Sequence, residues 1–351
     1  MKKTLLPIAC IALISCGGSS DSSGDASDGG ADGGSHPGGL FNSLVQELAV
    51  IGSEVYLSGP FEDVGGDDSL DYFVKWDGEA FVAPGAGAPP NVQRLMVHDG
   101  TLYTCGGPQI APTNHEHFIS TFDGSSWADI AAFESTDDQV VDCVISPSGE
   151  VHMAGSFTFD GGQPHEGVVK WDGSELLAVG GEVTEVGQVR IADDGTVYLV
   201  RMGANVDPGD LHRLNGDVWE PVPALPGGMT FVNHPWINTV GNNLHAAALV
   251  EDASHDGQDT DFYVWNGSTW QSQTGDQSFE FGFPHPTYRA VNGEYYASRY
   301  GMWAKWSGDG WVEVTPTMTF RNTEDAWSAQ VDYGLAIGVS GSEVYVAGYY
   351  P

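Results

Sequence analysis

Basic residues are scarce in this sequence: 12 Lys and Arg stand against 48 Asp and Glu, which gives a formal net charge of −36. Nucleic-acid binding needs basic side chains that neutralise phosphates, so this charge argues against a nucleic-acid partner. It argues equally against adsorption to anionic lipid headgroups. Two interpretations of the charge remain, namely a highly soluble surface or an attraction for cations, Ca²⁺ in particular.

Catalytic signatures are also lacking. There is no Gly-x-Ser-x-Gly elbow, no phosphate-binding loop and no His-Glu-x-x-His. The sialidase-type Asp-box, Ser-x-Asp-x-Gly-x-x-Trp, is not met, because in "STFDGSSW" Asp123 directly precedes Gly124. Carboxylate pairs of the kind that hydrolyse glycosides occur by chance in any acidic chain. We therefore lean towards a protein that is not an enzyme and leave the question open.

Cysteine is rare, with four in the chain. Cys10 and Cys16 belong to the N-terminal segment discussed next, which leaves Cys105 and Cys143. Outside the cytoplasm two remaining thiols often pair. The sequence does not show whether the two are close, so a disulfide and two buried thiols are both open.

The N-terminus has the pattern of an export signal. Lys2 and Lys3 precede an apolar stretch, 4–14, that is too short to span a bilayer as a helix. It ends in "LISC", which resembles the lipobox of bacterial lipoproteins and implies a signal peptide over 1–15 and a lipid on Cys16. Residues 16–39 are rich in Gly, Ser and Asp and predict a disordered tether. The resemblance implies an exported lipoprotein at the outer membrane or cell surface, in contact with the membrane through its lipid alone.

One hairpin pattern recurs through the rest of the chain. Near-copies of "FVKWDGEAF" are spaced by 41 to 51 residues, which is the length of a four-stranded propeller blade. The six copies lie at 73–81, 119–127, 168–176, 211–219, 262–270 and 303–311. Asp-Gly and Asn-Gly in these hairpins favour two-residue type I′ turns, and the flanking Trp residues suit packing between blades.

A second recurring element precedes each hairpin and completes the unit. It is a Gly or Asn turn followed by an alternating apolar run of the "VYLSG" type. Seven copies lie at 52–59, 99–107, 148–155, 194–200, 241–248, 292–298 and 340–348. Each follows a further short apolar run, so the unit has four strands, which we name a to d in chain order. No segment shows sustained helical periodicity.

These repeats resemble kelch and galactose-oxidase-like β-propeller repeats, and more closely the "VYVGG…WDGxxW" repeats of bacterial surface proteins. The resemblance implies an all-β propeller of four-stranded blades over 40–351. The kelch double glycine occurs cleanly only at Gly106-Gly107, and no copper ligands or Tyr–Cys pair are found, so oxidase chemistry is not implied. We predict seven blades with a composite last blade that "LFNSL" (40–44) completes. The alternative is six blades with a trailing hairpin.

Candidate site residues fall mainly on the variable connections between strands b and c. Asp252, Asp256, Asp259 and Asp261 have the composition of a Ca²⁺ site but not the spacing of an EF-hand, and a solvated acidic loop is the simpler interpretation. His115 and His117 would share one side of an extended segment, with His165 as the nearest third ligand for a metal. Trp236 and Tyr288 could form an aromatic platform for a sugar on the loop face.

The predicted function is therefore a monomeric binding or scaffold module for a glycan, a protein or a cation. Calcium is the only cofactor considered. Two alternatives remain open: a polysaccharide-active enzyme with acidic residues on the b–c loops, and a structural component of the cell envelope. The fold alone does not choose among them.

Overall fold

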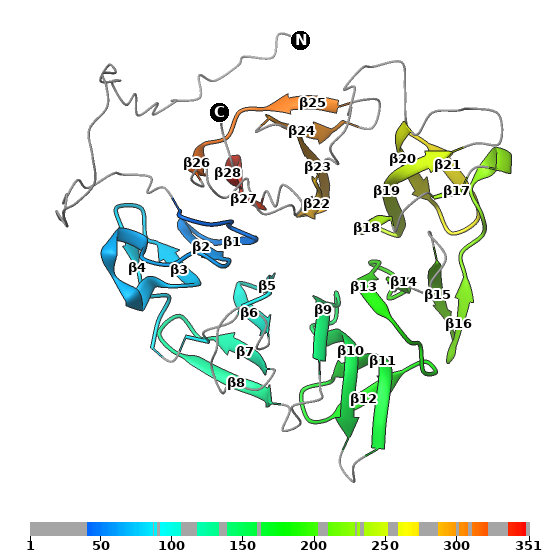
Figure 1. The fold of residues 1–351 in the computed structure, drawn as a ribbon, viewed down its shortest axis with the longest axis horizontal. Helices are drawn as coiled ribbons and strands as arrows, with labels where there is room; N and C mark the ends of the chain where they lie inside the picture. The colour runs from blue at the N-terminus through cyan, green and yellow to red at the C-terminus, as the bar shows by residue number, and fades with distance from the viewer. Residues whose placement is uncertain are drawn as a thin grey trace, which may run out of the picture.

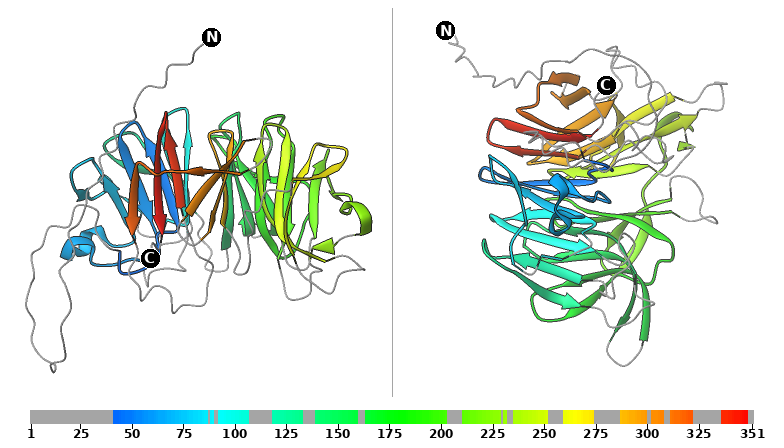
Figure 2. Two further views of the ribbon diagram at one scale, coloured as in Figure 1. Left: turned by 90° about the horizontal axis from the view of Figure 1, so that it is seen from above. Right: turned by 60° about the vertical axis from the view of Figure 1, so that its left-hand side comes forward.

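A computed structural model describes residues 41–86, 88–89, 92–106, 118–132, 139–159, 163–202, 210–228, 230–231, 235–251, 259–273, 287–299, 302–307, 311–321 and 336–348. These residues form a β-propeller whose sheets radiate from a common axis (Figure 1). Seen from the side, the strands run roughly along that axis (Figure 2). None of the described helices is long and apolar enough to cross a membrane.

The first three blades each have four antiparallel strands, and the first strand of each lies nearest the axis (Figure 1). Blade 1 contains β1 (Glu47–Ile51), β2 (Glu54–Ser58), β3 (Phe73–Trp76) and β4 (Phe81–Val82). Blade 2 contains β5 (Arg94–His98), β6 (Thr101–Gly106), β7 (Phe118–Phe122) and β8 (Trp127–Ala132). Blade 3 contains β9 (Gln139–Ile145), β10 (Val151–Phe159), β11 (Gln163–Trp171) and β12 (Leu176–Val179).

The next three blades repeat the pattern. Blade 4 contains β13 (Val186–Ile191), β14 (Val197–Arg201), β15 (Leu211–Asn215) and β16 (Val218–Pro221). Blade 5 contains β17 (Thr230–Phe231), β18 (Trp236–Val240), β19 (Asn243–Glu251), β20 (Asp259–Trp265) and β21 (Trp270–Ser272), with β17 and β18 pairing with β19. Blade 6 contains β22 (Thr287–Val291), β23 (Glu294–Arg299), β24 (Met302–Trp306) and β25 (Trp311–Val314).

The prediction of seven four-stranded blades with a composite last blade is wrong. Six blades are complete, and a three-stranded closing sheet lies between blades 6 and 1, in the order β26 (Met318–Arg321), β28 (Glu343–Gly348) and β27 (Ala336–Ser340). Among the described residues, the strand that pairs with the outer edge of β28 in the closing sheet is β26, which runs parallel to it. The N-terminal segment 40–44 does not fill this place. The segment after β25 is nearer to β28 along the chain than residues 40–44 are, so pairing it with β28 closes a shorter loop at a lower entropy cost. The six-blade alternative with a trailing hairpin describes the structure.

The hydrophobic core is divided into clusters that lie between successive sheets. Tyr56 and Phe73 of blade 1 pack with Leu102 and Trp127 of blade 2. Tyr296 and Trp303 of blade 6 pack in the same way with Ile337 and Val346 of the closing sheet. Because each strand is covered by a neighbouring sheet on both faces, near-continuous apolar runs such as "VYL" are buried rather than alternating with solvent-facing residues.

The recurring Trp residues join successive blades, as predicted. The indole N–H of Trp127 in β8 donates to the Pro84 carbonyl of the preceding blade at 2.8 Å. Trp270 in β21 donates to the Pro223 carbonyl at 2.6 Å, and Trp219 in β16 to the Gly181 carbonyl at 3.2 Å. Each indole therefore combines apolar burial with one hydrogen bond to the neighbouring blade. This contact accounts for the recurrence of the motif without a ligand.

The predicted type I′ turns of the Trp-Asp-Gly hairpins are wrong. The first turn residue does not have a positive φ; instead its side chain accepts hydrogen bonds from the amides two and three residues later. Asp123, for example, accepts from the Ser125 and Ser126 amides, both at 2.8 Å, and these bonds lower its pKa to about 2. The same turn forms at Asp77, Asp172 and Asn266. In these turns the hydrogen bonds from nearby backbone amides to the Asp or Asn side chain stabilise the turn, so its first residue does not adopt the left-handed conformation.

Type I′ geometry occurs instead between strands a and b. Asp99 and Gly100, which link β5 to β6, have φ values of 48° and 76°. Asn292 and Gly293, which link β22 to β23, have φ values of 52° and 74°. Both central residues of these two-residue loops are left-handed, as the turn requires. The preference of Asp-Gly and Asn-Gly for type I′ turns therefore holds in these two a–b hairpins and fails in the c–d hairpins.

Candidate functional site: the axial network

Polar side chains from six inner strands meet at the propeller axis. Each inner strand is the edge of its sheet and contributes one residue, and these residues recur at nearly the blade period. We call this set the axial network: Glu47, Arg94, Asp142, Arg190, Asn238 and Arg289. Buried charges are costly unless they are paired, so a ring of them in a protein core requires close ion pairs.

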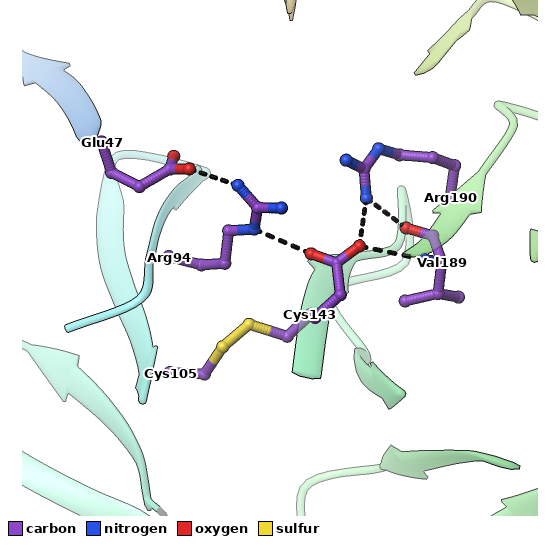
Figure 3. The surroundings of a disulfide bond; sticks show 7 residues. Glu47, Arg94, Cys105, Cys143, Val189 and Arg190 are labelled. Carbon is purple, nitrogen blue, oxygen red and sulfur yellow. Dashed lines mark hydrogen bonds and ion pairs between the residues drawn. A yellow bond between two sulfur atoms is a disulfide. The ribbon is translucent and has the colours of Figure 1, made fainter. Parts of the chain in front are cut away.

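Asp142 in β9 is the centre of the network, and its side chain has no exposed surface. Its carboxylate accepts from Arg94 Nε at 2.7 Å, from an Arg190 guanidinium nitrogen at 2.5 Å and from the Val189 amide at 3.0 Å (Figure 3). Burial raises the pKa of Asp142, but the guanidinium groups of Arg190 and Arg94 lower it by more, so the pKa lies below its usual value. The residue is therefore a carboxylate at neutral pH and links three blades.

Glu47 in β1 continues the network on the other side of Arg94. Its Oε1 accepts a hydrogen bond from Arg94 Nη1 (Figure 3). The same oxygen lies 3.9 Å from Nη2 of Arg289 in β22. Burial lowers the pKa of Arg289, Glu47 raises it, and the nearby Arg94 and Arg190 lower it further. One carboxylate is thus shared by two guanidinium groups.

A disulfide lies beside the network. Cys105 in β6 of blade 2 is bonded to Cys143 in β9 of blade 3, with a Cα–Cα distance of 6.7 Å (Figure 3). Cys105 is the cross-strand partner of Arg94, and Cys143 directly follows Asp142. Of the two alternatives that the sequence left open, the structure has the disulfide. Blades 2 and 3 are therefore joined by one covalent bond and one ion pair at adjacent positions.

Side chains also join the free edges of the inner strands and so fix the position of the network. Gln188 in β13 accepts from the Ile237 amide at 3.2 Å and donates to the Pro235 carbonyl at 3.1 Å. Ser340 in β27 donates to the Gly52 carbonyl at 2.9 Å and so links the closing sheet to blade 1. These bonds use edge groups that would otherwise be unsatisfied and leave little freedom around the axis.

Concave regions among the described residues include an axial cavity and a groove between two blades. An axial cavity of about 460 Å³ lies between β1, β5, β22 and β27, and its only charged lining residues are Glu47 and Arg289. A groove of about 510 Å³ lies between blades 3 and 4 and is lined in part by Glu150, Lys170 and Asp193. In the groove the Lys170 ammonium is held by Glu150 at 2.6 Å. The axial cavity is the stronger candidate because its charged groups are half-buried and belong to a network.

A buried histidine, His245 in β19, is the cross-strand partner of Asn238. Its ring lies between Phe262 and Tyr295, with ring centroids 5.6 Å and 4.9 Å away. Burial lowers its pKa to about 4, whereas an unfolded His titrates near 6.5. His245 is therefore neutral at pH 7, and its protonation is linked to unfolding.

We expect His245 to make stability depend on pH below neutrality. Between pH 6.5 and pH 4 the unfolded chain binds a proton that the folded His245 does not, so stability is complete above pH 6.5 and falls as the pH decreases. The loss attributable to this residue is roughly 3 kcal/mol at pH 4. Urea unfolding at pH 7.5 and pH 4 should show a smaller loss for His245→Phe than for the wild type. Equal losses in the two proteins would contradict this assignment.

Most of the site residues predicted from the sequence are not brought together. Cys16, His115, His117, Asp252 and Asp256 lie outside the described residues. Asp259 and Asp261 belong to β20, where they pair with Val250 and Ala248 of β19. Trp236 begins β18 and is half-buried, and Tyr288 lies in β22 opposite Ala297. His165 is buried in β11, near the Val168 carbonyl. Within the described ranges, no group of three or more His, Cys, Asp or Glu side chains is placed to hold a metal ion.

The first b–c loop uses its acidic side chains for its own backbone. Asp71 accepts from the Asp63 amide at 2.7 Å, and Asp67 accepts from the Ser69 amide at 2.9 Å. These bonds hold the two short 3₁₀ turns η1 (Val64–Gly66) and η2 (Asp68–Leu70). The third b–c connection is mostly a long hairpin of β10 and β11.

Sequence reasoning missed the axial network. It did not single out Glu47, Arg94, Asp142, Arg190 or Arg289. A usable signal was present: these residues stand in otherwise apolar first strands and recur every 47 to 51 residues. Polar residues repeated at the blade period in the innermost strands lie near one another at the axis.

Comparisons with known proteins agree with the fold. No protein-family model and no curated protein matches the chain. The extracellular domain of a one-component system from B. thetaiotaomicron resembles it with a TM-score of 0.51 at 10% identity, over 89% of this chain and 38% of that chain. Virginiamycin B lyase from Staphylococcus aureus gives 0.44 at 10% identity, over 78% and 84%. The β-propeller domain of the Trilobed protease from Pyrococcus furiosus gives 0.40 at 14% identity, over 69% and 70%.

Proposed function

We propose that the chain is an exported lipoprotein whose propeller serves as a non-enzymatic binding module at the bacterial surface. In this proposal Cys16 carries the lipid, residues 17–39 form the tether, and the repeats are of the kelch-like "WDGxxW" type. The observation that supports binding is the axial cavity, because it is concave, preformed and lined by strands that neighbouring blades hold in place. The ligand classes considered are a glycan, a protein and a cation.

Catalysis is the weaker proposal on the described residues. An acid or base needs a carboxylate that reaches a substrate, whereas Asp67 and Asp71 of the first b–c loop already accept from backbone amides. The Asp142 carboxylate of the axial network is held by the guanidinium groups of Arg94 and Arg190, which lower its pKa and so its basicity. Both sets of contacts favour a structural or binding role.

The test exposes the purified protein to a panel of neutral and acidic polysaccharides with Ca²⁺ present and records retention and released fragments. Retention without fragments is the expected result. Fragments whose release is abolished by replacing loop carboxylates would instead establish a polysaccharide-active enzyme. Absence of both would leave a protein partner or a structural envelope role.

The lipid anchor is tested separately. Palmitate labelling of the protein is expected, and Cys16→Ser should abolish it.

A further inference from the structure

A Glu-x-Tyr unit recurs at the start of strand b, and blade 3 departs from it. Tyr56, Tyr296 and Tyr345 each donate to the carboxylate of the Glu two residues earlier, at 2.9, 2.8 and 2.8 Å. In blade 3 this position is His152, which lies opposite a Lys of strand c as Tyr56 and Tyr296 do. The shorter imidazole contacts the backbone carbonyl of Glu150, at 3.4 Å from Nδ1. The groove between blades 3 and 4 is lined by both residues.

His152 presents one hydrogen-bond acceptor to this groove. The residue is 5% exposed and lines the groove. A carbonyl oxygen only accepts, so the contact with Glu150 places the ring proton on Nδ1 and makes Nε2 an acceptor. Burial lowers the pKa of His152, so the ring is neutral at pH 7. Within the described part of the chain Nε2 has no hydrogen-bond partner, and a ligand donor that reaches it would make a bond that the protein does not supply.

The opposite wall of the groove adds negative charge. Its carboxylates come from Asp193, Asp194 and Asp217 of blade 4. None of the three is paired with a Lys, Arg or His side chain of the described ranges. On the blade 3 wall Lys170 and Glu150 neutralise each other at 2.6 Å. The open groups of the groove are therefore acceptors, which favours a positively charged ligand with several N–H donors.

An organic cation fits these groups better than a metal ion. A metal ion needs ligands gathered around one point, and the described residues contain no group of three His, Cys, Asp or Glu so placed. The ammonium groups of an organic cation bond separated acceptors, and its methylene groups need apolar surface. The groove has apolar lining from both blades, namely Val179, Ile191, Val197 and Leu214. Its volume of about 510 Å³ is in the range of small-molecule sites.

We propose that the groove between blades 3 and 4 binds a linear alkyl polyamine. One ammonium group donates to Nε2 of His152, the others lie at Asp193 and Asp217, and the methylene chain packs on Val179 and Leu214. The formal net charge of −36 draws polycations to the protein at long range, and the groove holds them by these short contacts. The site is separate from the axial cavity, so the proposal goes beyond the binding function proposed above and does not depend on it.

The test measures binding of spermidine to the full protein by calorimetry. A salt concentration of about 0.15 M screens diffuse attraction to the acidic surface. Spermidine should bind saturably at one site. Triethylene glycol, a neutral chain of the same length, should bind at least about tenfold more weakly, and an equal concentration of Ca²⁺ should not displace spermidine.

His152→Tyr is the most specific variant, because it gives blade 3 the residue that blades 1 and 6 have at this position. The phenol removes the imidazole acceptor and occupies part of the groove next to Glu150. The variant should keep the Tm of the wild type and weaken spermidine binding at least about tenfold. A folded His152→Tyr protein that binds spermidine as the wild type does would overturn the proposal.

A pair of double variants separates the groove from the charge of the whole protein. Asp193→Asn with Asp217→Asn should weaken spermidine binding at least about tenfold. The matched control, Glu79→Gln with Glu313→Gln, removes two exposed carboxylates of blades 1 and 6 and should change binding less than about twofold. If His152→Tyr does not fold, this comparison decides the question, because the four residues exchanged are all exposed.

Four results would each reject the polyamine site: no saturable binding of spermidine, equal binding of triethylene glycol, displacement by Ca²⁺, or equal losses in the two double variants. Binding of oligolysine without binding of spermidine would also reject it and would make the groove a surface for a basic peptide. Retention of polysaccharides in the earlier experiment is independent of these outcomes, so the binding function can stand when the polyamine site fails.

Discussion

Replacing Asp142 by alanine should lower the free energy of unfolding by about 3–5 kcal/mol, the usual cost of removing one partner from a buried ion pair. The reason is local and specific. Without this carboxylate the Arg94 guanidinium keeps Glu47 alone as its carboxylate partner, and the Val189 amide loses its acceptor. Two buried positive charges are then insufficiently compensated. The measurement is equilibrium unfolding in urea at pH 7.

Asp210→Ala is the matched control. Asp210 accepts from one arginine, Arg201, whereas Asp142 accepts from two, and the Asp210 side chain is 21% exposed compared with 0% for Asp142. An exposed pair of this kind contributes about 0.2–1 kcal/mol. If the two alanine variants lost similar free energies, the buried network would not be a major source of stability. Because the pKa of Asp142 is lowered on folding, its contribution is present above the normal Asp value of 3.8 and is lost as the pH falls below it.

Removal of the Cys105–Cys143 disulfide should be the second large effect. The bond closes a loop with a sequence separation of 38 residues, for which loop entropy predicts a loss of about 4 kcal/mol. The double variant Cys105→Ala with Cys143→Ala should therefore unfold at clearly lower urea concentration than the oxidised wild type. Reduced wild-type protein is the best control, since it has the same sequence without the bond.

Chemical labelling tests the same bond directly. Alkylation of unfolded protein without reductant should add no label at Cys105 or Cys143, and labelling after reduction should add two. Label at both residues before reduction would show free thiols and remove the basis of the stability prediction. Coupling is also expected: because the bond and the Arg94–Asp142 pair hold the same two blades, their losses should not be additive.

The sequence was most informative where the signal is local. Each of the seven "VYLSG"-type stretches includes the start of the strand that pairs with the inner strand of its sheet, from β2 to β28, because an apolar run after a Gly or Asn turn is a sufficient local code. Local reasoning failed at Asp123, where a side-chain acceptor competes with left-handed turn geometry. It also failed for the last sheet, because the choice between residues 40–44 and 318–321 depends on which segment reaches β28.

The candidate site was missed for a different reason. Trp127 could be assigned to an interface between blades, but its acceptor, the Pro84 carbonyl, lies 43 residues earlier and carries no sequence signal. Glu47, Arg94 and Asp142 are ordinary charged residues until the ring is closed and their strands meet. The two partners of each contact between blades belong to different repeats, so the sequence of a single repeat does not show the contact.

The contact between β27 and β1 determines the order in which parts of the propeller can fold. Gly338 packs so closely on Leu48 and Val50 that a Cβ atom there would collide with both side chains, and Ser340 bonds the Gly52 carbonyl across a separation of 288 residues. Such distant pairing forms late, because the entropy of closing a very long loop must be overcome first. Until β27 and β28 arrive, Val55 and Leu57 of blade 1 and Tyr296 and Trp303 of blade 6 lack their covering sheet. A propeller that has not yet closed therefore exposes two apolar sheet faces. Its risk of aggregation is highest before β27 and β28 pack against blades 6 and 1.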